Sequence, residues 1–344
     1  MSDVGRTRLA DRSLNPVLRR ELLERWRGRR AVLVMTLYLG VLGGLLLLLR
    51  WIGGRVLAEQ MQFGFGGPVL SPGPMLGRFL LENLLALVLG LVLLVAPGYA
   101  AAQLSGERER RTLGLLRITL VRPRSIVLGK LGASSAWIVL LVVVSAPLAA
   151  TAFALGGATP GDLVRGLLVV LVTAVSVAAV ALGVSSRARR TTGAVVTTYA
   201  FVLLLVVGTL IGAFAQFAAS GFSMGSDRPA ALYLNPFYAL ADATNATTGF
   251  GGQLPSVLTP FAAALPGDRF GDPFGEPVDR PMMVEEAGVV GMVEADLQPL
   301  PAGPERRSGD AVWPWTLLWY TLLAGLSLTL ASRSLGPRDG VRET

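Results

Sequence analysis

The sequence predicts an all-α polytopic membrane protein with six transmembrane helices and with both termini in the cytoplasm. Three observations predict this fold. Hydrophobic residues make up 52% of the 344 residues and charged residues only 16%, which is far too apolar for a soluble domain. Six apolar runs each approach the roughly 20 residues that a bilayer crossing needs. Finally, 22 of the 31 Lys and Arg residues lie in segments that would share one side of the membrane.

The six runs divide the chain into four parts. A cytoplasmic segment, 1–30, precedes spans one to five in 31–219, an extracytoplasmic loop fills 220–312, and the last span and tail occupy 313–344. The segment before the first run is too long and too charged for a cleavable signal peptide, so the first span is expected to stay as an anchor. The expected spans are Ala31–Leu49, Leu80–Ala102, Leu131–Leu155, Leu163–Ser185, Ala194–Ala219 and Trp313–Ala331.

The placement of basic residues predicts the orientation. Lys and Arg gather in 1–30, 103–130, 186–193 and after residue 331. The positive-inside rule places these segments in the cytoplasm. The net charge of +8 is therefore explained by topology and contact with anionic lipid, and no nucleic-acid partner is expected.

The segment Leu14–Arg30, LNPVLRRELLERWRGRR, is predicted to form an amphipathic helix that lies at the headgroup level. Asn15-Pro16 suits a helix start. The alternative is a basic anchor that only fixes the topology. The residues taken to define the interfacial helix are Leu18, Arg19, Glu21, Leu22 and Trp26.

Small residues and prolines mark candidate packing and bending points in the spans. Gly40 and Gly44 in the first span, and Gly208 and Gly212 in the fifth, have the spacing that lets helix backbones approach closely. Their partner could be another helix of this chain or a second chain. Pro97 and Pro147 each remove a backbone donor inside a span and are expected to kink it.

The loop after the second span, Gly106–Lys130, reads GERERRTLGLLRITLVRPRSIVLGK. Ser105 is predicted to cap a short helix whose first turn carries acidic residues. A break at Pro123 then restarts the chain into the third span. The leucines of this helix need a covering surface, which could be the protein's own helix ends or a partner.

This loop resembles the cytoplasmic coupling segment of ABC-2 type transporter permeases, the type V ABC exporter-like transmembrane subunits. The resemblance rests on G-E-R-E-R-x-T-L, on the P-x-x-I-x-x-G-K restart, and on N-P-x-L-x-R-E-L-x-x-R before the first span. An N-P-x-x-A-L element in Leu232–Thr244 also matches. The resemblance to this family implies that the loop Gly106–Lys130 contains a coupling helix that docks on a partner ATPase. The implied docking residues are Glu107, Arg108, Glu109, Arg111, Thr112, Leu113 and Leu116.

The resemblance also implies an assembly. Two permeases, either two copies or one copy and a homologous chain, would join two cytoplasmic ABC ATPases in a bacterial plasma membrane. Membrane lipid is the further expected partner. ATP and Mg would bind the ATPase, with no cofactor in this chain. Substrate would pass near the dimer axis.

Missing residue types narrow the function. Without His or Cys, the usual metal clusters and a Ser–His dyad are excluded. Gly129-Lys130 is not part of a Walker A motif, because Arg124 stands where Gly is needed and Leu131 where Ser or Thr is needed. The chain is therefore not expected to be an enzyme by itself. Nearly uncharged span interiors argue against ion coupling. The alternative function is a non-transporting membrane scaffold or sensor that recruits a cytoplasmic partner.

The outer loop holds two different regions. Leu232–Thr244 has an amphipathic helical pattern, which could be an interfacial helix packed on the spans or a cap over the outer exit of a transport path. The region after it is rich in proline, so long regular helices are not expected there.

Overall fold

A computed structural model describes residues 29–62, 72–111, 123–219, 230–244, 258 and 311–335. Every regular element in these ranges is helical, and six helices are long and apolar enough to cross a membrane, which confirms the predicted number. They are α3 (Arg29–Gln62), α4 (Pro72–Glu109), α6 (Pro123–Leu155), α7 (Pro160–Arg187), the continuous α8 (Thr191–Leu203), η1 (Leu204–Gly208) and α9 (Thr209–Ala219), and α12 (Trp313–Leu335).

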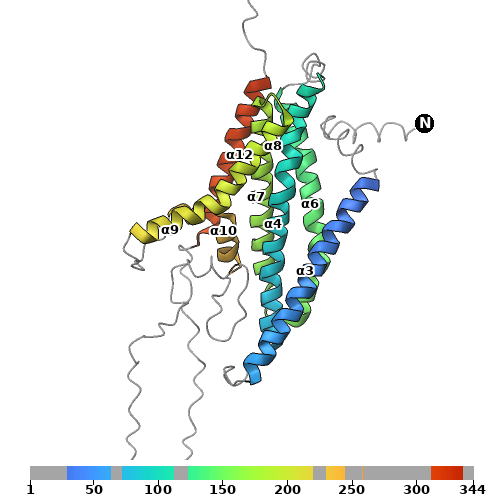
Figure 1. Ribbon diagram of the computed structural model, residues 1–344, viewed down its shortest axis with the longest axis vertical. Coiled ribbons are helices and arrows are strands. Elements are labelled where there is room, and N and C mark those ends of the chain that lie inside the picture. The colour runs from blue at the N-terminus through green and yellow to red at the C-terminus, as the bar shows by residue number, and fades with distance from the viewer. Residues whose placement is uncertain are drawn as a thin grey trace, which may run out of the picture.

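Helices α4 and α7 form the centre of the bundle. They pack on each other, α6 packs on both, α12 packs on α7 and α6, and α3 lies outside against α4 and α6 (Figure 1). Burial follows this order: 72% of the most apolar stretch of α4 is buried, against 17% for α3. Small residues of α7 such as Ala174 and Ala178 are fully buried, and a Cβ on Gly166 would lie 2.6 Å from the Leu85 side chain of α4, so small residues let helices approach α7 closely.

Close backbone packing also joins α4 to the turn between α6 and α7. A methyl group on Gly77 would overlap the carbonyl oxygens of Ala152 and Gly156. In the turn itself, Gly157 has a φ of +77°, which an L side chain rarely adopts. Glycine at these positions therefore decides how closely α4 meets the α6–α7 turn.

The two prolines lie inside helices that continue through them, Pro97 in α4 and Pro147 in α6. Beside Pro97, the Tyr199 hydroxyl of α8 donates to the Leu94 carbonyl at 2.5 Å. A Cβ on Gly98 would lie 2.8 Å from this hydroxyl. Gly98 thus leaves room for the Tyr199 side chain of α8 to pack on α4.

The fifth span changes helix type at η1, a π-helical segment, and α9 leans away from the bundle (Figure 1). Asn235 supports this change. Its amide donates to the Val206 carbonyl at 3.0 Å and to the Thr209 hydroxyl at 2.8 Å. The wider helix turn leaves a carbonyl available to this outside donor.

The predicted amphipathic element in Leu232–Thr244 is helical, but it is two short helices, η2 (Ala230–Leu234) and α10 (Pro236–Ala243). Asn235 separates them because its Oδ1 caps α10, accepting from the Phe237 and Tyr238 amides at 2.9 and 3.2 Å. Asp242 then caps α12 from outside, since its Oδ2 accepts from the Val312 and Trp313 amides at 2.7 and 3.0 Å. The pair of short helices is therefore joined to the fifth and sixth spans.

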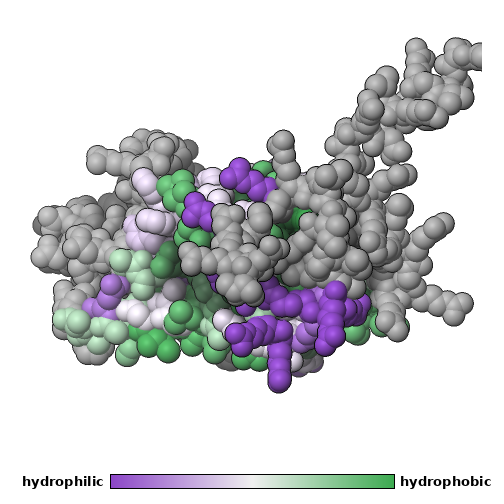
Figure 2. Space-filling view, turned by 90° about the horizontal axis from the view of Figure 1, so that it is seen from above, coloured by the Kyte–Doolittle hydropathy of each residue, from purple (hydrophilic) through white to green (hydrophobic). Residues whose placement is uncertain are grey.

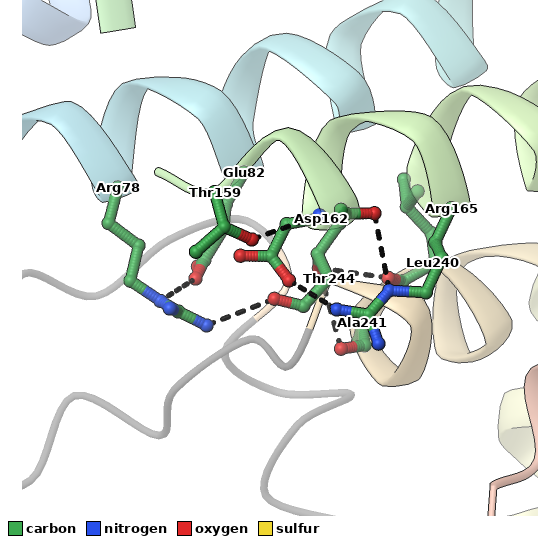
Figure 3. A network of polar contacts seen from close by, with 9 residues as sticks. Arg78, Glu82, Thr159, Asp162, Arg165, Leu240, Ala241 and Thr244 are labelled. Carbon is green, nitrogen blue, oxygen red and sulfur yellow. Dashed lines mark hydrogen bonds and ion pairs between the residues drawn. The ribbon is translucent and has the colours of Figure 1, made fainter. Parts of the chain in front are cut away.

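Two arginines at this end of the bundle, Arg78 and Arg165, each pair with a carboxylate of their own helix (Figure 3). Arg78 of α4 contacts Glu82 at 3.1 Å and donates to the Thr244 carbonyl at 2.9 Å, at the C-terminal end of α10. Arg165 of α7 contacts Asp162 at 2.7 Å. A cation at a helix C-terminus is favourable, so Arg78 holds α10 against α4.

Candidate functional site

The candidate site lies where α4 ends and α6 begins, at the end of the bundle predicted to face the cytoplasm. Here one expectation was wrong: Ser105 does not cap a separate helix, because α4 continues through it to Glu109. Inside an uninterrupted helix the backbone amides after Ser105 already donate within the helix, so its hydroxyl has no first-turn amide to cap. Its buried hydroxyl instead donates to the Ala101 carbonyl at 2.9 Å.

Glu107 joins α4 to α6. Its Oε1 lies 2.7 Å from the Nζ of Lys130, the single lysine of the chain. The Lys130 side chain is 3% exposed and that of Glu107 is 24% exposed. The ammonium is thus removed from water with its partner in place, which is the arrangement that a buried charge requires.

Arg108 joins α4 to the end of α7. Its guanidinium donates to the carbonyl of Ser186 at 2.7 Å and to that of Ala188. The last carbonyls of a helix lack partners within that helix and carry partial negative charge. Arg108, from the neighbouring helix α4, supplies both hydrogen-bond donors and a positive charge to these carbonyls.

Glu109 joins α4 to the start of α8. Its two carboxylate oxygens accept from the amide and the hydroxyl of Thr191, each at 2.8 Å. Arg190, the residue before α8, makes no side-chain cap of its own. A carboxylate from α4 therefore supplies the cap that the local sequence lacks.

Four residues before Glu109, a buried pair of serines, Ser105 of α4 and Ser185 of α7, joins the two helices. The Ser185 hydroxyl accepts from the amides of Leu104 and Ser105 at 3.1 and 2.9 Å and donates to the Ser105 hydroxyl at 3.3 Å. Both serines are fully buried. These bonds hold the end of α4 in register with α7.

Arg111 turns the chain out of α4. Its φ is +59°, and its amide bonds to the Arg108 carbonyl at 3.1 Å. Glycine usually holds this position after a helix, since other residues are strained there. The exposed Arg111 side chain is left beside the start of segment 112–122.

The other predicted docking residues, Thr112, Leu113 and Leu116, lie outside the described residues. So do the interfacial-helix residues Leu18, Arg19, Glu21, Leu22 and Trp26. Gly40 and Gly44 are described, and a methyl group on either would meet no atom within 4 Å. Gly212 packs on η2, where a Cβ would lie 3.3 Å from Ala231, whereas Gly208 faces Leu204 of its own span.

Sequence reasoning missed the residues that receive these contacts, namely Lys130 as a partner of Glu107, and Ser185, Ser186, Ala188 and Thr191. The separation along the chain is 23 residues for the Lys130 pair and about 80 for the others. Short motifs carry no signal over such distances. Thr191, placed just before an apolar run, is the residue that helix-start rules could have found.

The arrangement links the end of one helix to three other helices. Three consecutive residues, Glu107, Arg108 and Glu109, which we call the anchor residues, bind three different helices. Within the described ranges, no group of three or more His, Cys, Asp or Glu residues could hold a metal ion. What the site can do is transmit a displacement of the adjoining segment to α6, α7 and α8.

Comparison with known proteins agrees with this architecture. The model of a family described as ABC-2 family transporter protein matches residues 77–332. The match begins in α4, includes all the anchor contacts, and ends in α12. No curated protein matches the chain.

Proposed function

Because this chain belongs to the ABC-2 family of transporter proteins, we propose that it is the membrane subunit of a bacterial ABC exporter. It would move substrate across the plasma membrane with ATP hydrolysed by a separate subunit. The family generally works with cytoplasmic ABC ATPases, and the chain is a multi-pass membrane protein. Export direction and the ATPase partner are the proposed parts.

The observation that carries the proposal is the set of contacts made by the anchor residues. They flank segment 112–122, which carries the leucines proposed to dock on the ATPase. A push on that segment would reach α6 through Lys130, the end of α7 through Arg108, and the start of α8 through Glu109. In this mechanism the ATPase supplies the movement, and the anchor residues pass it to the spans.

The anchor contacts also distinguish the residues proposed to bind the ATPase from those proposed to transmit its movement to the membrane spans. Leu113 and Leu116 would bind the ATPase surface, whereas Arg108 is engaged with this chain's own carbonyls. Replacing both leucines with Asp should remove association with the ATPase. Arg108→Gln should preserve association but lower the ATP turnover that depends on the complex.

The first test is purification from native membranes in mild detergent, with mass spectrometry and ATPase assay of what accompanies the chain. A stoichiometric ABC ATPase whose turnover depends on this subunit supports the proposal. Thr192→Asp is the control for the leucine variants, since it adds charge at the same end on an exposed residue outside the segment. Recovery of a different soluble partner, or of none, would favour a scaffold.

Orientation can be tested separately because the chain has no cysteine. Gly161→Cys and Thr192→Cys place single thiols on exposed residues at opposite ends of the bundle. A membrane-impermeant maleimide should label the first in intact cells and the second only after permeabilisation. The reverse pattern would invert the topology and remove the proposed ATPase site from the cytoplasm.

A further inference from the structure

A groove lies between α7, α8 and α12 at the same end of the bundle as the anchor residues. Its volume is about 490 Å³. Its lining includes the aliphatic side chains of Val180, Val184 and Leu330, the arginines Arg187, Arg189 and Arg190, the hydroxyl residues Thr197 and Ser327, and the small residues Gly183, Ala188 and Gly193. The groove thus has an apolar wall and a cationic rim.

The apolar wall runs along the membrane-spanning part of α7. Val180 lies seven residues before Arg187, which is about 10 Å along a helix. On the opposite side, Leu330 belongs to α12, the last span. Gly183 lets α12 come close, since a Cβ there would lie 3.3 Å from Ser327. An occupant of this wall must therefore be apolar over the length of at least two helical turns.

The rim is formed by the short connection between α7 and α8. Its three arginines are exposed, and within the described part of the chain their guanidinium groups form no hydrogen bond or ion pair. The nearby carboxylate, Glu109, accepts two hydrogen bonds from Thr191 and also interacts electrostatically with the charge of Arg190. Seen from this end, hydrophilic side chains gather beside hydrophobic ones on the described surface (Figure 2). With one carboxylate beside three arginines among the described residues, the rim keeps a net positive charge, which favours an anionic occupant.

We propose that this groove binds one anionic phospholipid. The phosphate group lies among Arg187, Arg189 and Arg190, and an acyl chain follows Val180, Val184 and Leu330 toward the membrane interior. Charge complementarity selects the headgroup, and the apolar wall at the depth of the spans selects a lipid over a soluble partner. Lipid binding requires only that the chain spans a membrane, so the test of this proposal does not depend on the proposed exporter function.

Native mass spectrometry of the detergent-purified chain tests the selectivity of the groove. Phosphatidylglycerol and phosphatidylcholine are added in equal amounts, and retained lipid is counted. Wild-type protein should retain phosphatidylglycerol preferentially. In R187Q/R189Q/R190Q, phosphatidylglycerol affinity should fall roughly fivefold for each arginine removed, the effect expected of a basic residue near an anionic headgroup. Equal retention of the two lipids by wild type would overturn the proposal.

A matched variant, R110Q/R111Q/R124Q, removes the same charge from exposed residues at the same end that do not line the groove. It should bind phosphatidylglycerol like wild type. An equal loss in both triple variants would show a general charge effect and contradict a defined site.

A crosslink keeps the test valid if the triple variant fails to fold. Thr197 lines the groove, and Thr197→p-benzoylphenylalanine places a photoreactive group there in an otherwise unchanged chain. Irradiation in native membranes should give adducts with the mass of an anionic phospholipid. Adducts with another protein, with a peptide of this chain, or with lipids in bulk proportion would each overturn the proposal.

Discussion

Glu109 at the end of α4 caps α8 by accepting both the amide and the hydroxyl of Thr191, each at 2.8 Å. The two residues are 82 positions apart, and the contact leaves the start of the fifth span dependent on the end of the second. A charged residue at the end of α4 therefore has a structural partner within its own chain.

This cap predicts a local effect of substitution. In Glu109→Ala the Thr191 amide loses its acceptor, so its hydrogen exchange should accelerate while the middle of α8 stays protected. Glu109→Gln is the matched control, because one amide oxygen can still accept from Thr191 and should retain most of the protection. Unchanged exchange in the Ala variant would mean that the cap is not formed in the membrane.

The ion pair between α4 and α6 predicts a larger loss. Lys130→Met removes the ammonium from the ion pair with the half-buried Glu107 carboxylate, and we expect a loss of about 3 kcal/mol in stability, the low end for breaking a buried pair. Thermal unfolding in detergent measures it. The exchanged pair Glu107→Lys with Lys130→Glu should recover part of the loss. A double variant as unstable as the sum of its single variants would show that the two charges do not interact.

Close packing predicts that Gly77→Ala is harmful although alanine favours helices. The added methyl group overlaps the carbonyl oxygens of Ala152 and Gly156, so α4 and the α6–α7 turn must separate. Overpacking of this kind costs about 1–3 kcal/mol. Gly90→Ala is the control within the same helix, because its Cβ would meet nothing within 4 Å. A lower unfolding temperature is expected for the first variant and not for the second.

The two roles of Asn235 can be separated by substitution. Asn235→Ser keeps a side-chain oxygen that can cap α10 but loses the amide NH2 group that donates to the Val206 carbonyl, whereas Asn235→Ala loses both groups. The Ala variant should be less stable than the Ser variant by about 1 kcal/mol, the usual value of a cap. Equal stability of the two variants would mean that the contribution of Asn235 to stability comes entirely from its hydrogen bonds to the fifth span.

Asp242 predicts the behaviour of the start of the last span. It is 2% exposed and is the acceptor for the Val312 and Trp313 amides. Asp242→Ala should speed hydrogen exchange at both amides, and Asp242→Asn should not, because an amide oxygen can take the same bonds. Slow exchange in both variants would mean that another group caps α12.

Much of the fold could be predicted from the sequence, since a bilayer imposes length and hydropathy on each span without reference to its neighbours. The six spans, the helical pattern in Leu232–Thr244 and the family followed from local residue patterns. The positions of the helix ends could not be predicted from local residue patterns. At Ser105 a capping pattern predicted a new helix, yet α4 continues, because its buried face packs on α7 beyond the apolar run.

By itself, the sequence determined that this chain is a six-span membrane protein of the ABC-2 family and predicted a coupling motif in Gly106–Lys130, because hydropathy and short motifs are properties of neighbouring residues. The tertiary structure alone decided what the charged residues of that motif contact. Glu107, Arg108 and Glu109 are adjacent in the chain, yet they bind α6, α7 and α8. The physical reason is that charges at a membrane boundary are satisfied by the helix ends that packing brings near them, and packing depends on the whole bundle.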